Sequence, residues 1–132
     1  MSDPSAVQRR ALLIGHGQFA DGLLSAVGQI CGMRDVIMGM SMVGLTPEAI
    51  ESTLRAKLTE TGASVIFTDL PAGSATLAAR RIVKEDPAIV LVSGVNLATL
   101  LDFVFNATGT PAEAARSAAE RGKASLIVVE RK

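Results

Sequence analysis

Short, continuous apolar runs alternate along the chain with segments whose apolar residues recur every three or four positions. Continuous runs of this length are typical of strands that are covered on both faces, as in a parallel sheet. The predicted strands are Ala11–Ile14, Val36–Met42, Val65–Phe67, Ile89–Val92 and Leu126–Val129.

The segments between these runs carry helix start and stop signals. Thr46, followed by Pro47, is a typical helix start, and Thr110 and Glu113 have the spacing of a capping box. Glycines offer the corresponding stops. The predicted helices run from about Phe19 to Gly32, from Thr46 to Gly62, from Ser74 to Glu85, from Asn96 or Thr99 through Phe105, and from Thr110 to Gly122.

Strands that alternate with helices predict an α/β fold in which helices cover both faces of a parallel sheet. Right-handed crossovers favour a flavodoxin-like, doubly wound sheet in the order 2-1-3-4, with Leu126–Val129 added as a C-terminal edge strand. The 132 residues match one domain in size, and no linker or internal repeat divides them. We therefore expect a single domain over residues 1–132.

Composition excludes several classes of protein. Thirteen basic residues balance thirteen acidic ones, and no basic stripe with stacking aromatics is present, so we expect no nucleic-acid partner. The single Cys31 rules out an internal disulfide and favours a reducing compartment. No apolar run approaches the roughly 18 residues of a membrane span, and the N-terminus lacks a secretory signal, so a cytoplasmic location is expected.

Two polar residues follow neighbouring strands of the predicted sheet. His16, the only histidine, stands between Gly15 and Gly17 directly after the first strand, and Asp69 directly follows the third. In this architecture both strands end at the switch point, where ligands bind. Flanking glycines leave room around the imidazole, and an aspartate that holds the proton of one ring nitrogen leaves the other as a nucleophile. The alternative is a surface-loop histidine without a role.

The same edge offers donors for a phosphoryl group. Helices that begin near Gln18 and Ser74 would aim their free N–H groups and positive dipole ends at the site. Gly17, Gly73 and Ser74 are therefore candidate phosphate-binding residues, although Ser74 fits equally well as a helix N-cap. With one His and one Cys in the chain, we expect no metal centre and no cofactor, because stable metal sites gather three or four ligands.

Three segments resemble a known family. The residues are His16-Gly17-x-Phe19-Ala20-x-Gly22-Leu23, Phe67-Thr68-Asp69-Leu70 and Gly94-Val95-Asn96-Leu97. They are similar to the IIA domains of mannose-type sugar phosphotransferase systems, and the resemblance covers nearly the whole chain.

The resemblance implies a phosphotransferase that works as a carrier. His16 would accept a phosphoryl group from the phosphocarrier HPr, Asp69 would orient the histidine, and a IIB component would receive the group for sugar uptake. The membrane would be reached only indirectly, through IIC and IID components. Members of the family pair as homodimers through their C-terminal strands, and we expect the same here, with the dimer weakened when residues 124–132 are deleted.

One loop departs from the family pattern, which usually reads Gly-Gly-Ser/Thr-Pro after the aspartate. Here it reads Ala72-Gly73-Ser74-Ala75, so one position gains a Cβ and the helix loses its proline start. The segment also resembles the phosphoryl carrier subunit of dihydroxyacetone kinase, which delivers to a kinase subunit. The Gly94–Leu97 segment favours the sugar system.

Three hypotheses from other classes remain. Gly15-x-Gly17-x-x-Ala20 satisfies a dinucleotide fingerprint, but the second strand ends without the acidic residue that would bind a ribose. Ser74, His16 and Asp69 have the residue types of a hydrolase triad, but the serine lacks the flanking glycines of a nucleophile elbow. A binding module without chemistry is the third.

Such a module would need a docking surface. Arg80, Arg81 and Lys84 lie at helical spacing and predict a basic face, which is either a docking surface or simply solvated.

Overall fold

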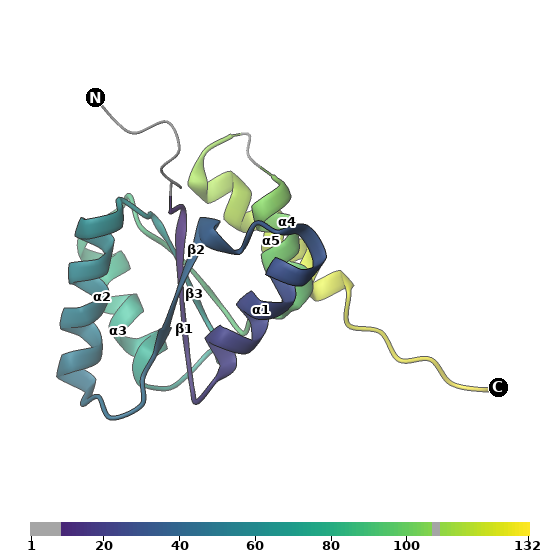
Figure 1. The fold of residues 1–132 in the computed structure, drawn as a ribbon, viewed down its shortest axis with the longest axis horizontal. Helices are drawn as coiled ribbons and strands as arrows, with labels where there is room; N and C mark the ends of the chain where they lie inside the picture. Colours follow the sequence, from purple (N-terminus) through teal and green to yellow (C-terminus); the bar gives the residue numbers. More distant parts are fainter. Residues whose placement is uncertain (1–8, 107–108) are drawn as a thin grey trace.

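The computed structural model describes residues 9–106 and 109–132 (Figure 1). Its centre is a four-stranded parallel sheet in the order β2-β1-β3-β4, which confirms the predicted order. The strands are β1 (Ala11–Gly15), β2 (Ile37–Ser41), β3 (Val65–Thr68) and β4 (Val90–Ser93).

All five predicted helices are present, and they cover both faces of the sheet. In Figure 1, α2 and α3 lie on one face while α1, α4 and α5 lie on the other. The bounds are α1 (Phe19–Cys31), α2 (Pro47–Thr61), α3 (Ser74–Glu85), α4 (Leu97–Phe105) and α5 (Pro111–Ala124), with a short 3-10 turn at Arg34–Val36.

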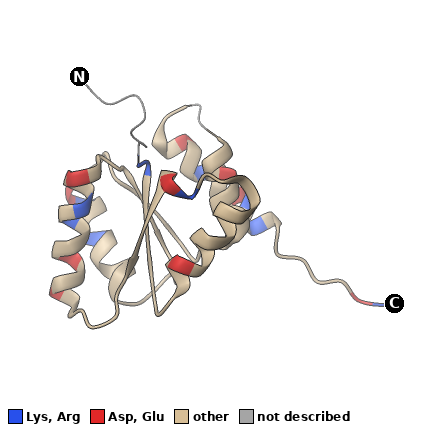
Figure 2. Cartoon of the chain, in the orientation of Figure 1, with Lys and Arg blue, Asp and Glu red and all other residues tan. Residues whose placement is uncertain are grey.

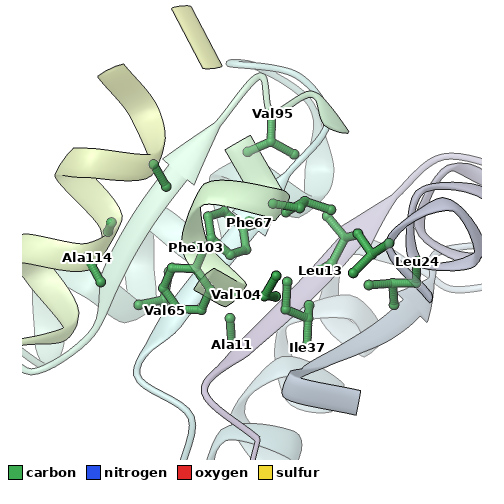
Figure 3. Packing of buried hydrophobic residues seen from close by; sticks show 14 of the residues in the cluster. Ala11, Leu13, Leu24, Ile37, Val65, Phe67, Val95, Phe103, Val104 and Ala114 are labelled. Carbon is green, nitrogen blue, oxygen red and sulfur yellow. The ribbon is translucent and has the colours of Figure 1, made fainter. Parts of the chain in front are cut away.

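The two central strands explain the continuous apolar runs. Successive side chains of a strand point to opposite faces, so Leu12 packs towards α2 and α3 while Leu13 packs towards α1 and α4. Figure 3 shows the second of these cores, where the rings of Phe67 and Phe103 meet edge to face with 5.0 Å between their centroids. Because the side chains of β1 and β3 are buried on both faces of the sheet, polar residues occur only at the ends of these strands.

Side-chain caps begin α2, α4 and α5 as the sequence indicates. The Thr46 hydroxyl accepts from Ala49 N–H at 3.1 Å at the start of α2, and the Thr110 hydroxyl accepts from Glu113 N–H at 3.1 Å at the start of α5. At α4, Asn96 is the N-cap and Thr99 completes a capping box with it, so the earlier of the two predicted start residues is the correct one.

The prediction of a fifth strand at Leu126–Val129 is wrong for the single chain. These four residues have no regular secondary structure, and each is between 73% and 87% exposed. Figure 1 shows the C-terminal segment leaving α5 and extending away from the sheet. Strand propensity reflects packing against neighbours in a sheet, and along this path the segment reaches no strand with which to pair.

Candidate functional site

His16 and Asp69 meet at the carboxyl edge of the sheet. β1 and β3 are neighbours whose last paired residues are Ile14 and Thr68, so the residues that follow emerge side by side. One carboxylate oxygen of Asp69, Oδ2, accepts a hydrogen bond from the His16 backbone N–H at 2.8 Å and lies 2.8 Å from His16 Nδ1. The predicted pairing of these two side chains is present in the structure.

This contact selects the tautomer of the imidazole. An ionised carboxylate can only accept hydrogen bonds, so the proton between the two side chains belongs to His16 Nδ1. The lone pair of the neutral ring is then on Nε2. The His16 side chain is 61% exposed and that of Asp69 only 9%, so the histidine is the accessible member of the pair and the aspartate its support.

The environment of Asp69 keeps its carboxylate ionised. Burial by itself raises the pKa of Asp69. Hydrogen bonds from the His16 backbone N–H and from its ring, the electrostatic interaction with that ring, and a bond from the Asp69 backbone together outweigh burial and hold the pKa of Asp69 below its usual value. The carboxylate is therefore ionised at neutral pH and able to accept both bonds.

Glycines make the close approach possible. A Cβ on Gly15 would lie 2.7 Å from Phe19 Cδ1 and 3.0 Å from Asp69 Oδ2, so only glycine fits between helix α1 and the carboxylate. Gly17 has a φ of +50° and Gly73 a φ of +109°, which side-chain-bearing residues rarely adopt. A Cβ on Gly73 would lie 3.7 Å from His16 Cε1, so the loop after β3 passes next to the ring.

The predicted phosphate-binding residues lie at this edge, Gly17 and Gly73 on loops and Ser74 at the start of α3. Gly17 follows His16 directly, and Gln18 is the N-cap of α1. Gly73 is the N-cap of α3, so Ser74 is the first residue of that helix, and the alternative reading of Ser74 as the cap is wrong. The N-terminus of α3, with its free backbone N–H groups, therefore lies beside the imidazole.

The sequence matches the family described as "PTS system fructose IIA component" (EIIA-man) over residues 10–120. The chain belongs to this family. Comparison with curated proteins gives no match.

Solved structures of IIA proteins have the same fold as this IIA chain. The EIIA component from Streptococcus agalactiae has a TM-score of 0.82 at 18% identity, covering 90% of this chain and 95% of its own. The mannose/sorbose-specific IIA subunit from Enterococcus faecalis has a TM-score of 0.81 at 20% identity, covering 96% and 98% respectively. A IIA protein associated with the fucose utilization operon of Streptococcus pneumoniae gives 0.76 at 20% identity, covering 93% and 94%.

Sequence reasoning missed Thr76 of the IIA chain. Its side chain is buried in the first turn of α3, and its hydroxyl oxygen lies 2.5 Å from the Leu70 carbonyl oxygen and 2.8 Å from Thr68 Oγ1. Thr68 and Leu70 flank Asp69. No local sequence signal marks Thr76, because its burial and its contacts with Thr68 and Leu70 appear only in the folded structure.

The basic face predicted on α3 is partly neutralised. Arg81 Nε lies 2.5 Å from Glu51 Oε1 on α2, and Arg55 pairs with both Glu51 and Glu85. The hydrogen bonds from Arg81 and Arg55 lower the pKa of Glu51. Figure 2 shows both signs of charge along α2, so Arg81 of α3 faces a surface of mixed charge.

The His16 edge is open to solvent, since the His16 side chain is 61% exposed. Among the hollows on the surface of the described residues are four of about 190 to 550 Å³, and none of these is lined by His16 or Asp69. Across residues 9–106 and 109–132, no group of three His, Cys, Asp or Glu side chains is placed to hold a metal ion. No helix within those ranges is long and apolar enough to span a membrane.

Proposed function

We propose that this IIA chain is a phosphohistidine carrier, which takes a phosphoryl group from phospho-HPr on His16 Nε2 and passes it to a IIB component for sugar uptake and phosphorylation. The observation that carries the proposal is the 2.8 Å contact between His16 Nδ1 and Asp69 Oδ2, made by an imidazole that is otherwise exposed. That contact leaves one nitrogen with a lone pair and gives the ring a counter-ion. Membership of the IIA family supports the same role.

In the proposed transfer, the His16 Nε2 lone pair attacks phosphorus while the bond from phosphorus to the donor's histidine nitrogen breaks. The electron pair of that bond goes to the donor nitrogen. Nδ1 keeps its proton, so the phosphorylated ring gains positive charge, which the Asp69 carboxylate stabilises. The N–H groups at the start of α3, with Gly17, Gly73 and Ser74, would receive the phosphoryl oxygens. The chain contributes positioning and electrostatics.

The surroundings of His16 support a protein as the partner on both sides of the transfer. The imidazole stands on an open edge with 61% of its side chain exposed, whereas a site for a free sugar would enclose most of the ligand. A side chain carried on the surface of another protein can reach an exposed ring. Sugar selectivity would then belong to the membrane components, which this chain would meet only through IIB, in the cytoplasm.

The exposed C-terminal segment supports a homodimer. Leu126–Val129 is apolar and exposed, and the outer edge of β4 is paired with no strand of the described chain. A groove of about 250 Å³ runs between the end of β4, the start of α4 and the end of α5. The same segment of a second copy would bury its apolar residues there and cover the open edge.

The loop after β3 favours a second candidate for the protein that receives the phosphoryl group, a dihydroxyacetone kinase subunit. Ala72 and Ala75 stand where the sugar-system pattern usually has glycine and proline, and α3 begins without a proline in its first turn. The carrier subunit of dihydroxyacetone kinase uses the same histidine chemistry with a different acceptor. The dinucleotide and hydrolase hypotheses find no support in the family.

The test is labelling by phosphorylated HPr. We expect one phosphate per chain, acid-labile and base-stable as an N–P bond is, and no labelling of a His16→Gln variant with an unchanged circular dichroism spectrum. A loop side chain contributes little to the core, so this variant should fold. Adding a IIB component or a dihydroxyacetone kinase subunit then identifies the acceptor. A wild-type chain that takes no phosphate, or a labelled His16→Gln variant, would contradict the proposal.

A further inference from the structure

Three oxygens form a small hydrogen-bonded cluster around the backbone of Asp69. They are the Thr76 hydroxyl, the Thr68 hydroxyl and the Leu70 carbonyl oxygen, which we name the threonine clamp. Thr76 Oγ1 lies 2.5 Å from the carbonyl and 2.8 Å from Thr68 Oγ1, and the latter two oxygens are 3.4 Å apart. The clamp therefore joins the residue before Asp69 to the residue after it.

One side of the clamp is fixed by the sheet. Thr68 ends β3, where it is paired with Ile14 on one side and Ser93 on the other, and its carbonyl accepts a bond from Val95 N–H at 3.2 Å. Its side chain is fully buried. The position of Thr68 is thus set by strands on both sides, independently of the loop that follows.

The other side of the clamp is a loop with little packing of its own. Leu70, Pro71 and Ala72 are all exposed, so apolar burial does not hold this stretch in place. The bond from Thr76 ties the Leu70 carbonyl to α3, which is itself packed on the sheet. Asp69 is held between an anchored strand end and an anchored helix.

The choice of threonine at this position points to the hydroxyl. In a helix, Thr usually bonds back to a carbonyl three or four residues earlier on its own helix. Thr76 bonds instead to residues six and eight positions earlier, outside α3. Valine would fill the same buried space without a polar atom to satisfy, so packing alone does not require a hydroxyl here.

We propose that Thr76 is a positioning residue, which fixes the direction of the Asp69 carboxylate and, through it, the tautomer and orientation of the His16 ring. The inference rests on the proposed function, in which Asp69 selects that tautomer. Thr76 acts only through Asp69, and its hydroxyl takes no part in the transfer. Small displacements of an orienting group cost rate steeply, since about 1 Å can cost about 100-fold.

The experiment compares Thr76→Val with Thr76→Ser by two measurements. The first is the nitrogen NMR spectrum of the imidazole, which reports a single residue because His16 is the only histidine. The second is the rate of phosphoryl transfer from phospho-HPr. For Thr76→Val we expect a smaller fraction of the Nδ1–H tautomer and transfer that is about tenfold slower. Thr76→Ser keeps the hydroxyl and should restore both to near wild-type values.

The matched control is Thr59→Val, the same change at an exposed position of α2. It should alter neither measurement. If Thr76→Val does not fold, Thr68→Val replaces it, since this removes the other hydroxyl of the clamp and should shift both measurements in the same direction. A folded Thr76→Val with wild-type tautomer and rate would overturn the inference, and so would equal losses in Thr76→Val and Thr76→Ser.

The two measurements also separate this inference from the proposed function. The tautomer is read in the unphosphorylated protein, so it tests the clamp even if the chain takes no phosphate from HPr. In that case the proposed function fails, and the Val and Ser variants still decide whether Thr76 orients Asp69. If the wild type is phosphorylated normally and Thr76→Val behaves identically, only the positioning role of Thr76 is contradicted, and the proposed carrier function stands.

Discussion

A single oxygen atom of Asp69 serves two purposes. Asp69 Oδ2 accepts a hydrogen bond from the His16 backbone N–H, which fixes the start of the loop after β1. The same oxygen contacts His16 Nδ1, which fixes the orientation of the imidazole ring. Both bonds come from one residue, so the backbone and the imidazole of His16 are held in a fixed relation. A glutamate would carry the same charge, but its extra methylene would move that oxygen out of this position.

Asp69→Asn should slow phosphoryl transfer while the fold is retained. The amide still makes hydrogen bonds, but it removes the charge that stabilises the phosphorylated ring, and its NH₂ group can donate to Nδ1 and select the other tautomer. We expect a loss of about 10- to 1,000-fold in the transfer rate from phospho-HPr. Wild-type rates in a correctly folded Asp69→Asn protein would remove the carboxylate from the mechanism.

The lowered pKa of Asp69 also predicts how stability depends on pH. Because the pKa is lower in the folded than in the unfolded chain, ionised Asp69 stabilises the fold fully above its unfolded pKa. That contribution is lost as the pH falls through the folded pKa. The stability advantage of the wild type over Asp69→Asn, measured by urea unfolding, should fall as the pH drops through the acid range in which Asp69 titrates. An advantage that stays constant through that range would argue against this linkage.

At the scale of elements, the site depends on how closely α1 and the loop after β3 approach the end of β1. Gly15 occupies the point where the three converge, with Phe19 of α1 on one side and Asp69 on the other. The strand and the helix are each predictable from their own patterns. Their distance at this junction depends on the absence of one Cβ.

Gly15→Ala should therefore damage the site, whereas the same change at Gly22 should not. The new Cβ at position 15 would clash with Phe19 and press on the Asp69 carboxylate, which we expect to cost about 1–3 kcal/mol of stability and to slow transfer. Gly22 lies within α1 with open space around its Cβ position, so alanine there should stabilise the helix by up to about 1 kcal/mol. Urea unfolding and HPr-dependent labelling of both variants make the comparison. Equal effects at the two positions would contradict this account of Gly15.

At the scale of the whole molecule, the C-terminal segment is the feature that the isolated chain leaves unpaired. Leu126 and Ile127 follow Ser125, the C-cap of α5, and stand in solvent with Val128 and Val129. Four consecutive exposed aliphatic residues are unusual for a surface that stays uncovered. Together with the open edge of β4, they predict a second copy as the missing partner.

Removing residues 126–132 should therefore convert a homodimer into a monomer or weaken it strongly. This cut is better placed than one at residue 124, because Ala124 belongs to α5 and the Ser125 hydroxyl bonds to Gly122 and Asn96 near the end of that helix. The control removes only residues 130–132, which keeps the apolar run and should keep the dimer. Light scattering at micromolar concentration makes the measurement. A monomeric full-length protein would refute the prediction.

The sequence by itself determined those parts of the protein that depend on local pattern. Apolar periodicity and cap residues set the helices and the four sheet strands, because the 3.6-residue and two-residue repeats and the hydrogen bonds of a cap involve neighbours along the chain. The order of strands follows from right-handed crossovers. His16 and Asp69 could be paired in advance because the ends of adjacent parallel strands must meet at one edge.

Only the tertiary structure decided the features that depend on distant partners. Thr76 looks like any helical threonine until its hydroxyl is placed against Thr68 and Leu70, and Arg81 looks solvated until it faces Glu51 on another helix. Leu126–Val129 has the composition of a strand, but a strand needs an edge to pair with, and this segment reaches none among the described residues. Each of these outcomes depends on whether residues far apart in sequence come into contact, which no local pattern specifies.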